Sequence, residues 1–388
     1  IVLKLTLCQL ENRDPTTVIL DDKELLGEFE KEENLDEHFV KIFSFNLLKT
    51  KYLLDNYIVH HSNEDDIVDK NPWGLQILDK NANKISLKNL YKDNNIQNKI
   101  LQLLSMFEVS FTARQRKNYL FYILLYLSKN YQHNNKLDND YYKFLSGLAD
   151  KYFKDVYLDE HKLNEVNVPK PNSFDETILK DNDVDLILHN EKLCFNKIFG
   201  DSSNLTKRIP LFLFNYLDFK LWEKYTVEFP TKKELNSKEE KDKFFCTFGC
   251  EDFGSNIFDQ FYFSRTRRSL EHYFPHANAT GSDGFPDINQ INYFGNFAMI
   301  GNDANSSGSN WSPKTKLDHY MDASGKINQV GVASIKFRIM MQICKDNQGK
   351  RDPGKEWIFE DIKNHQSKML SLLNVDDDVE SPPQKPEY

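Results

Sequence analysis

Helical periodicity limits the fold of this chain more than any other feature. The run from residue 39 to residue 61 reads FVKIFSFNLLKTKYLLDNYIVHH. Its apolar residues recur four or seven positions apart, at Phe43, Leu47, Leu54 and Ile58. This spacing places them on one face of a helix, and a long helix must bury such a face against other elements. The run therefore predicts a long helix with one buried face.

The same periodicity continues along the chain. Residues 98–130 predict two helices on either side of a break, and Thr112 is suited to cap the second of them. Residues 139–157 and 208–224 predict further amphipathic helices. Phe (29) and Tyr (18) outnumber Gly (15) and Pro (13), which favours packed helices over a sandwich of short strands. We expect a mainly α-helical (α+β) fold.

Composition shifts divide the chain into parts. Residues 1–160 are expected to form a helical domain. Residues 161–185 contain prolines, many charges and few apolar positions, which is typical of a linker. We expect a second, C-terminal domain over 186–374. Residues 375–388, VDDDVESPPQKPEY, are acidic and contain prolines, and are expected to be a disordered tail.

The charge of the chain limits its partners. The formal net charge is -9, so a nucleic-acid partner requires a local basic surface. The most apolar run, residues 119–127, is too short to span a bilayer, and the sequence shows no signal peptide. We expect a cytoplasmic protein without a membrane partner.

Residues 265–320 contain the candidate catalytic and metal-binding residues. RSLEHYF, residues 268–274, alternates like a strand, and Pro275 ends it. INYFGNFAMI, residues 291–300, predicts a second strand. After a polar turn, Ser312 is placed to cap a helix whose first position is proline. The predicted order is strand, loop, strand, turn and helix.

Polar residues at the ends of these elements suit phosphodiester hydrolysis. A neutral histidine accepts a proton from water near pH 7, which favours His272 as the general base. Carboxylate and amide oxygens bind a hard ion such as Mg²⁺, which makes Glu271 and Asn305 candidate metal ligands. Asn296, after a glycine, is expected to orient His272 by a hydrogen bond. A packed histidine and a simple polar turn are the structural alternatives for His272 and Asn305.

The stretch resembles the HNH (ββα-metal) nuclease domain known as DUF1524. Its pattern is EH-x-x-P, GN[LF], N-x-x-x-x-N and P-x-x-K. The matching residues here are Glu271, His272, Pro275, Gly295, Asn296, Phe297, Asn305, Asn310, Pro313, and Lys314 or Lys316. Residues 45–61 and 103–127 resemble the helical region that follows the DUF262 domain in DUF262–DUF1524 proteins, and residues 334–370 resemble the family's C-terminal end. The resemblance implies an HNH nuclease domain that contains a ββα-metal motif.

Two departures from the family pattern matter. The family's DUF262 domain carries a D-G-Q-Q-R-like signature linked to nucleotide use, and no such run is present. Either the chain lacks that domain or the sequence begins after it, and a nucleotide cofactor is expected only if a DUF262 domain is present elsewhere. The residue after Pro275 is often glutamine in the family but is His276 here, so His276 is an accessory candidate, as is Asn310.

Basic residues flank the motif. Arg265, Arg267, Arg268, Lys314 and Lys316 are expected to bind DNA phosphates, and solvated surface charge is the alternative. Members of the family, such as GmrSD-type restriction enzymes, act in bacterial defence against phage DNA.

The resemblance therefore implies a DNA endonuclease or nickase that depends on one Mg²⁺ or Mn²⁺ ion. It also implies modified or phage DNA as substrate, a DUF262 NTPase or sensor domain as a partner, and a homo-oligomer as one assembly. The alternative is an inactive helical module for nucleic-acid binding or assembly.

Overall fold

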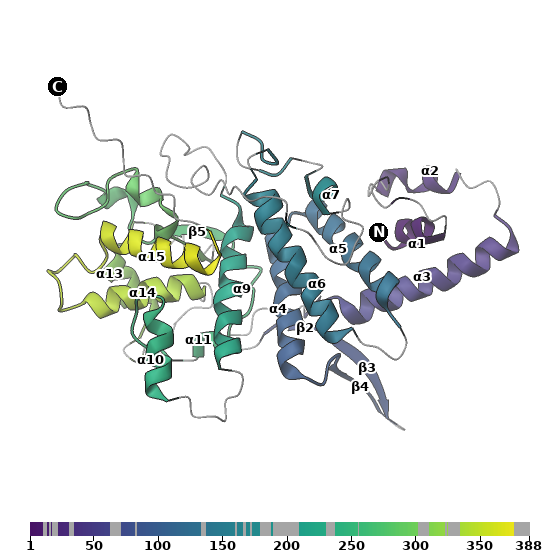
Figure 1. The fold of residues 1–388 in the computed structure, drawn as a ribbon, viewed down its shortest axis with the longest axis horizontal. Helices are drawn as coiled ribbons and strands as arrows, with labels where there is room; N and C mark the ends of the chain where they lie inside the picture. The colour runs from purple at the N-terminus through teal and green to yellow at the C-terminus, as the bar shows by residue number, and fades with distance from the viewer. Residues whose placement is uncertain are drawn as a thin grey trace. The chain divides into compact units, whose positions relative to one another are not determined.

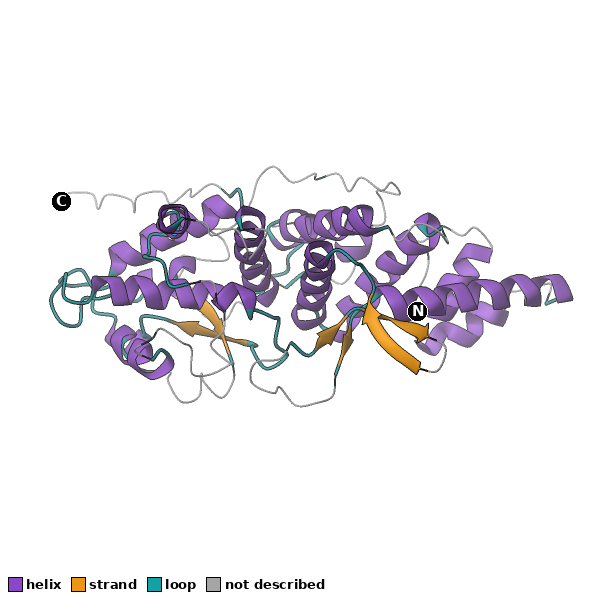
Figure 2. Ribbon diagram, turned by 90° about the horizontal axis from the view of Figure 1, so that it is seen from below, coloured by secondary structure: helices purple, strands orange, loops and turns teal. Residues whose placement is uncertain are grey.

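The computed structural model divides the chain into two compact units. It describes residues 1–10, 14, 17, 22–30, 35–62, 71–81, 84–132, 137–159, 161–165, 168–170, 173–178, 188, 209–229, 237–254, 256–301, 310–322, 324 and 334–375. The N-terminal unit comprises residues 1–163 and 169–191, and the C-terminal unit comprises residues 164–168 and 192–388. Helices dominate both units, and the strands form short antiparallel pairs (Figures 1 and 2). The expected mainly helical fold is confirmed at this level.

The N-terminal unit is built from helices around an apolar core. In chain order its elements are α1 (Val2–Leu10), η2 (Asp22–Glu24), α2 (Leu25–Glu30), α3 (Glu37–Tyr57), β1 (His60–His61), β2 (Trp73–Gly74), β3 (Gln76–Asn81), β4 (Lys84–Asn89), α4 (Asn94–Ser110), α5 (Ala113–Asn130), α6 (Asp138–Lys151), the π-helix η3 (Tyr152–Tyr157) and α7 (Ser173–Ile178). β1 pairs with β2, and β3 pairs with β4. The centre of the core consists of Ile100, Leu103, Leu104, Phe107, Ile123, Leu127, Leu145 and Leu148.

Local sequence signals place several of these boundaries. The Thr112 side chain accepts from the backbone N–H of Gln115. The Gln115 side-chain oxygen in turn accepts from the backbone N–H of Thr112. This reciprocal capping box begins α5 where the sequence predicted it. The expected linker, residues 161–185, is only partly described, but α7 lies within it. Ser173 and Ile178 are buried, so this part of the stretch is a packed helix and not an open linker.

The C-terminal unit surrounds one β-hairpin with helices. Its elements are α9 (Leu211–Glu228), α10 (Lys238–Cys246), α11 (Asn256–Asp259), β5 (Ser269–His272), η5 (His276–Asn278), η6 (Gln290–Asn292), η7 (Phe294–Asn296), β6 (Phe297–Ile300), α13 (Pro313–Tyr320), α14 (Ile335–Asn347) and α15 (Phe359–Leu372). The second strand is shorter than expected. Residues 291–296 contain two 3₁₀ turns before β6 begins, where Gly295 lies against α15 and Asn296 bonds back to Ile291.

Buried polar bonds hold the hairpin on the helices beneath it. Asp218 of α9 accepts from the Ser334 hydroxyl at 2.8 Å and from the Lys336 backbone N–H at 2.9 Å, which fixes the start of α14. The Lys336 ammonium then donates to the carbonyls of Phe294 at 2.9 Å and Phe297 at 2.6 Å. These buried polar groups are paired, as burial of charge requires. They fix the position at which β6 starts.

Two further expectations concern a membrane span and the C-terminal tail. No described helix is long and apolar enough to cross a membrane. The expected tail, residues 375–388, lies outside the described residues except for Val375, which is buried.

The buried histidine of α15 leads to a prediction about acid stability. His365 is 1% exposed, and burial lowers its pKa well below the usual value, with Lys336 and Lys368 lowering it further. Below about pH 6.5 the His365 imidazole is protonated in the unfolded state but stays neutral in the folded state. The free energy of unfolding therefore falls as pH falls below that value. His365→Phe should remove up to about 1.4 kcal/mol per pH unit of this loss. Urea unfolding of the wild type and of His365→Phe between pH 7.5 and pH 5 measures the free energy of unfolding at each pH. The same fall in this free energy for both proteins would contradict the prediction.

Candidate functional site

The hairpin and the helix that follows it bring the motif residues together. β5 pairs antiparallel with β6, with His272 opposite Phe297 and Glu271 opposite Ala298. α13 begins where the sequence predicted, since the Ser312 hydroxyl accepts from the Thr315 backbone N–H at 3.2 Å and Pro313 takes the first turn. The Tyr273 hydroxyl donates to the Pro313 carbonyl at 3.3 Å. This bond ties the start of α13 to the chain just beyond β5.

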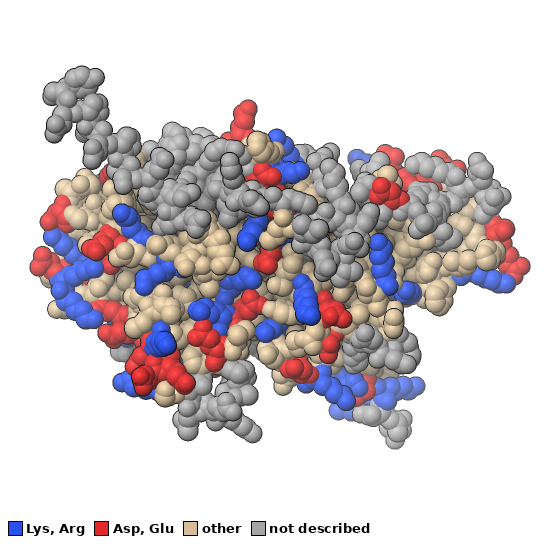
Figure 3. All heavy atoms as spheres, in the orientation of Figure 1, with Lys and Arg blue, Asp and Glu red and all other residues tan. Residues whose placement is uncertain are grey.

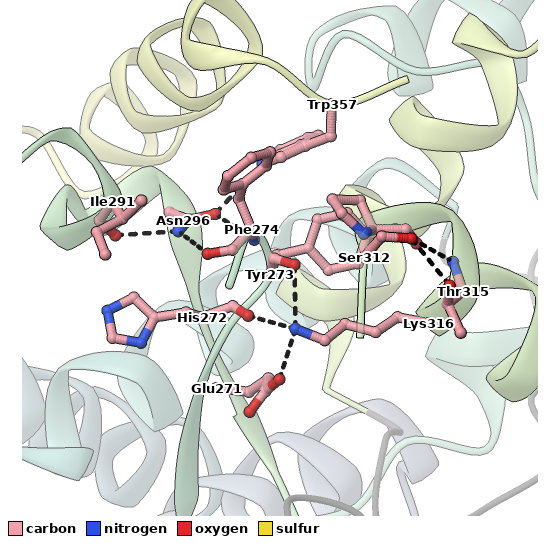
Figure 4. A network of polar contacts seen from close by, with 11 residues as sticks. Glu271, His272, Tyr273, Phe274, Ile291, Asn296, Ser312, Thr315, Lys316 and Trp357 are labelled. Carbon is pink, nitrogen blue, oxygen red and sulfur yellow. Dashed lines mark hydrogen bonds and ion pairs between the residues drawn. The ribbon is translucent and has the colours of Figure 1, made fainter. Parts of the chain in front are cut away.

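Lys316 of α13 reaches the end of β5. Its ammonium lies 2.6 Å from Glu271 Oε1 and donates to the carbonyls of His272 at 2.5 Å and Tyr273 at 3.1 Å (Figure 4). Glu271 is 5% exposed and Lys316 is 0% exposed. Burial raises the pKa of Glu271 and lowers that of Lys316, and the attraction between the two charges opposes both shifts. The two side chains form a buried ion pair.

His272 points away from this ion pair. Figure 4 shows its imidazole on the opposite side of the strand from Lys316, as alternation along a strand requires. The ring packs on Phe297 across the hairpin, with centroids 4.2 Å apart. Burial lowers the pKa of His272, the hydrogen bond with Asn292 raises it, and the charges of Lys316 and His276 lower it again. The net direction is downward, so the imidazole is neutral near pH 7.

Asn292, which the sequence did not single out, fixes the His272 ring. Asn292 Nδ2 donates to the Ile288 carbonyl at 3.1 Å, so its Oδ1 faces His272 Nε2 at 3.0 Å. An amide oxygen accepts, so Nε2 carries the proton and Nδ1 keeps its lone pair. A short DINQIN run with two asparagines is typical of a polar turn, and nothing local marks which of them meets His272.

Asn296 has a different role from the one expected. It is 0% exposed, and its Oδ1 accepts from the Phe274 backbone N–H at 2.8 Å and the Trp357 indole at 3.3 Å. Its Nδ2 donates to the carbonyls of Phe274 and Ile291, both at 3.0 Å. These four bonds use the whole amide, so the expected hydrogen bond to His272 is corrected to Asn292. Asn296 holds the loop that follows β5.

Gly295, the residue before Asn296, lies directly against α15. A Cβ on Gly295 would lie 2.0 Å from the Ile362 carbonyl oxygen and 3.0 Å from the Gln366 backbone nitrogen, both in α15. Only glycine permits this approach. Gly295 and Asn296 therefore join the hairpin to α15.

Two of the five expected DNA contacts are buried. Arg267 is 2% exposed, and its guanidinium donates to the Tyr262 carbonyl at 2.9 Å. β5 begins at Ser269, so Arg265 and Arg267 precede the strand. With Lys316 also buried, neither Arg267 nor Lys316 is accessible to a phosphate in this structure.

The other expected contacts remain at the surface. Arg265, Arg268 and Lys314 are exposed, as are the accessory candidates His276 and Asn310. On the face shown in Figure 3, acidic and basic side chains of the described residues are mixed. DNA binding by the exposed residues stays a prediction. Asn305, the second expected metal ligand, lies outside the described residues.

The described residues do not fit a divalent ion as they are arranged. Within the described ranges, no three His, Cys, Asp or Glu side chains are grouped to hold a metal. Glu271 is the one expected ligand that is described, and the ammonium of Lys316 already balances its charge. A hard divalent ion needs several oxygen ligands with uncompensated negative charge.

Comparison with known proteins leaves the class of protein open. No family model, no curated protein and no solved structure matches the chain. The chemistry of the site therefore rests on its own residues.

Proposed function

We propose that this chain is a DNA endonuclease or nickase of the HNH type, with His272 as the general base. The observation that carries the proposal is the state of that histidine. It is neutral by burial, and Asn292 directs its proton to Nε2, which leaves Nδ1 able to accept a proton. The strand–strand–helix order around it agrees with the predicted ββα motif.

The residues of the chain supply a base and its orientation. His272 Nδ1 takes a proton from water as the water oxygen bonds to phosphorus, and the P–O3′ bond breaks in line with it. The 3′ oxygen takes a proton from solvent and leaves as a 3′-hydroxyl. Asn292 stabilises the imidazolium that forms, because its Oδ1 accepts from Nε2 in both protonation states. Phe297 holds the ring plane from across the hairpin. The products should carry 5′-phosphates.

The wider biological role follows from the resemblance to DUF262–DUF1524 proteins. It makes the protein a cytoplasmic enzyme of a bacterial antiphage system that acts on phage or modified DNA. A DUF262 NTPase or sensor domain is its proposed partner, and a homo-oligomer its proposed assembly. Dependence on Mg²⁺ or Mn²⁺ is part of the same proposal.

The ion pair of Glu271 with Lys316 favours a second candidate. A carboxylate that is already neutralised suits an inactive module that has kept the fold for nucleic-acid binding or assembly. Such a module would bind DNA without cleaving it.

A plasmid assay tests the proposal. The full chain is incubated with supercoiled plasmid and Mg²⁺ or Mn²⁺, and the open-circular and linear products are separated on a gel. We expect nicked product with the metal and none with EDTA, and a ligase that needs a 5′-phosphate and a 3′-hydroxyl should reseal the nick. DNA binding without nicking in either metal would favour the inactive module. Nicking that persists in EDTA would keep the hydrolase and exclude its metal dependence.

A further inference from the structure

Helix α3 carries apolar residues on two opposite sides. One side holds the buried residues Leu53 and Tyr57, and α1 and α5 pack against the helix. The other side exposes Phe45, Leu48 and Tyr52, which are 68%, 70% and 46% exposed. A helix that is apolar on both sides is expected to be covered on both sides. The exposed side of α3 is therefore a candidate contact surface.

The exposed residues repeat with the period of a coiled coil. Lys41, Phe45, Leu48, Tyr52 and Asp55 follow one another at intervals of four, three, four and three residues. This alternation places all five on one narrow face of a helix, as in the contact line of a coiled coil. We call these five residues the outer stripe. Its middle is apolar, and the charged side chains at its two ends are exposed.

The two ends of the outer stripe carry opposite charges at equal distances from its centre. Lys41 stands seven residues before Leu48, and Asp55 stands seven residues after it. If two copies of the stripe run antiparallel with Leu48 against Leu48, each Lys41 lies opposite the Asp55 of the other copy. A parallel pair would set lysine against lysine and aspartate against aspartate. The stripe is therefore complementary to a second copy of itself in the antiparallel direction, as a two-fold axis requires.

We propose that the outer stripe is the interface of a symmetric dimer, in which two copies of α3 pack antiparallel about Leu48. The apolar side chains of both copies form its centre, and the charged pairs lie at its two ends. One helix from each copy makes a small interface, so we expect the dimer to dissociate in the micromolar range. The inference rests on the proposed function only in taking the assembly to be a homo-oligomer. Its tests use no DNA, so a protein that fails to nick plasmid still tests the dimer.

Leu48 provides the test of the interface. Sedimentation velocity of the full-length chain between about 1 and 100 µM measures the dissociation constant of the dimer. Leu48→Asp places two carboxylates at the two-fold axis and should leave a monomer over this range. Leu78→Asp is the matched control, because Leu78 is a similarly exposed leucine of β3 (72%) outside the stripe, and this variant should dimerise like the wild type. A wild type that stays monomeric, or equal behaviour of the two variants, would overturn the proposal.

Charge reversal tests the antiparallel direction. Lys41→Glu and Asp55→Lys each replace two attractive contacts of the dimer by repulsive ones, so each should raise the dissociation constant about tenfold. The double variant restores both contacts with the signs exchanged and should return to within about threefold of the wild type. Within their own helix Lys41 pairs with Glu37 and Asp55 pairs with Lys51, and the double variant loses both of these pairs. A double variant that dimerises more weakly than either single variant would show an effect within the helix and would overturn the proposed arrangement.

Discussion

Replacing His272 with alanine is expected to lower the rate of plasmid nicking by about 10²–10⁴-fold, the usual effect of losing a general base. The methyl group of alanine cannot accept the proton of water. The fold should survive, because His272 is only half-buried and its backbone bonds in the hairpin do not depend on its side chain. Initial nicking rates measure the loss, and thermal unfolding of both proteins shows whether the fold is retained.

His276 provides the control for this variant. It lies four residues further along, is exposed, and is the accessory candidate nearest to His272 in the sequence. His276→Ala should nick plasmid at nearly the wild-type rate. If the loss of activity follows His276→Ala instead, His276 is the base. Full activity in His272→Ala would remove the assignment altogether.

Local sequence signals predicted the elements of the site well. A side-chain cap or a proline acts within one turn of a helix, so Ser312 and Thr112 mark helix starts that can be read from four neighbouring residues. Pro275, which cannot continue the ladder, follows closely on β5 for the same local reason. The helical faces were predictable because periodicity is local as well.

The roles of individual polar residues were not predictable in this way. The sequence predicted Lys316 as a DNA-phosphate contact, with solvated surface charge as the alternative, yet it bonds to a carbonyl 44 residues earlier in the chain. Arg267 is buried near Asp218, which comes from a helix far back in the sequence. Burial of a charge depends on a partner brought in by the tertiary fold, and sequence spacing carries no record of that partner.

The two asparagines show the same limit in one short segment. Asn296 belongs to the Gly-Asn part of the predicted motif, so the sequence marked it as a candidate. Asn292 belongs to no such motif. The role expected of Asn296 belongs to Asn292 because residues 291–296 turn instead of extending. In that turn Asn292 meets the His272 ring, and Asn296 faces inward to Trp357. The length of β6 therefore decides which side chain reaches the proposed base.

Gly295→Ala is expected to destabilise the C-terminal unit by about 3 kcal/mol or more, at the upper end of the cost of overpacking. The added methyl group would meet the backbone carbonyl of Ile362, which cannot rotate away as a side chain could. α15 or the turn before β6 must therefore move. Thermal unfolding followed by circular dichroism should show a midpoint lower by roughly 10 °C, since 1 kcal/mol corresponds to about 2–4 °C in a unit of this size.

Gly354→Ala separates this steric effect from the general cost of replacing a glycine. Gly354 has a φ of +90°, and a Cβ there would meet nothing within 4 Å. Its replacement should cost roughly 1–2 kcal/mol, from the unfavourable left-handed backbone alone. The larger loss for Gly295→Ala would then come from the contact with α15. Because Asn296 follows directly and bonds to Phe274, that movement should also disturb the loop after His272 and lower nicking. Equal destabilisation by the two variants would show that α15 does not pack on Gly295 as closely as the structure places it.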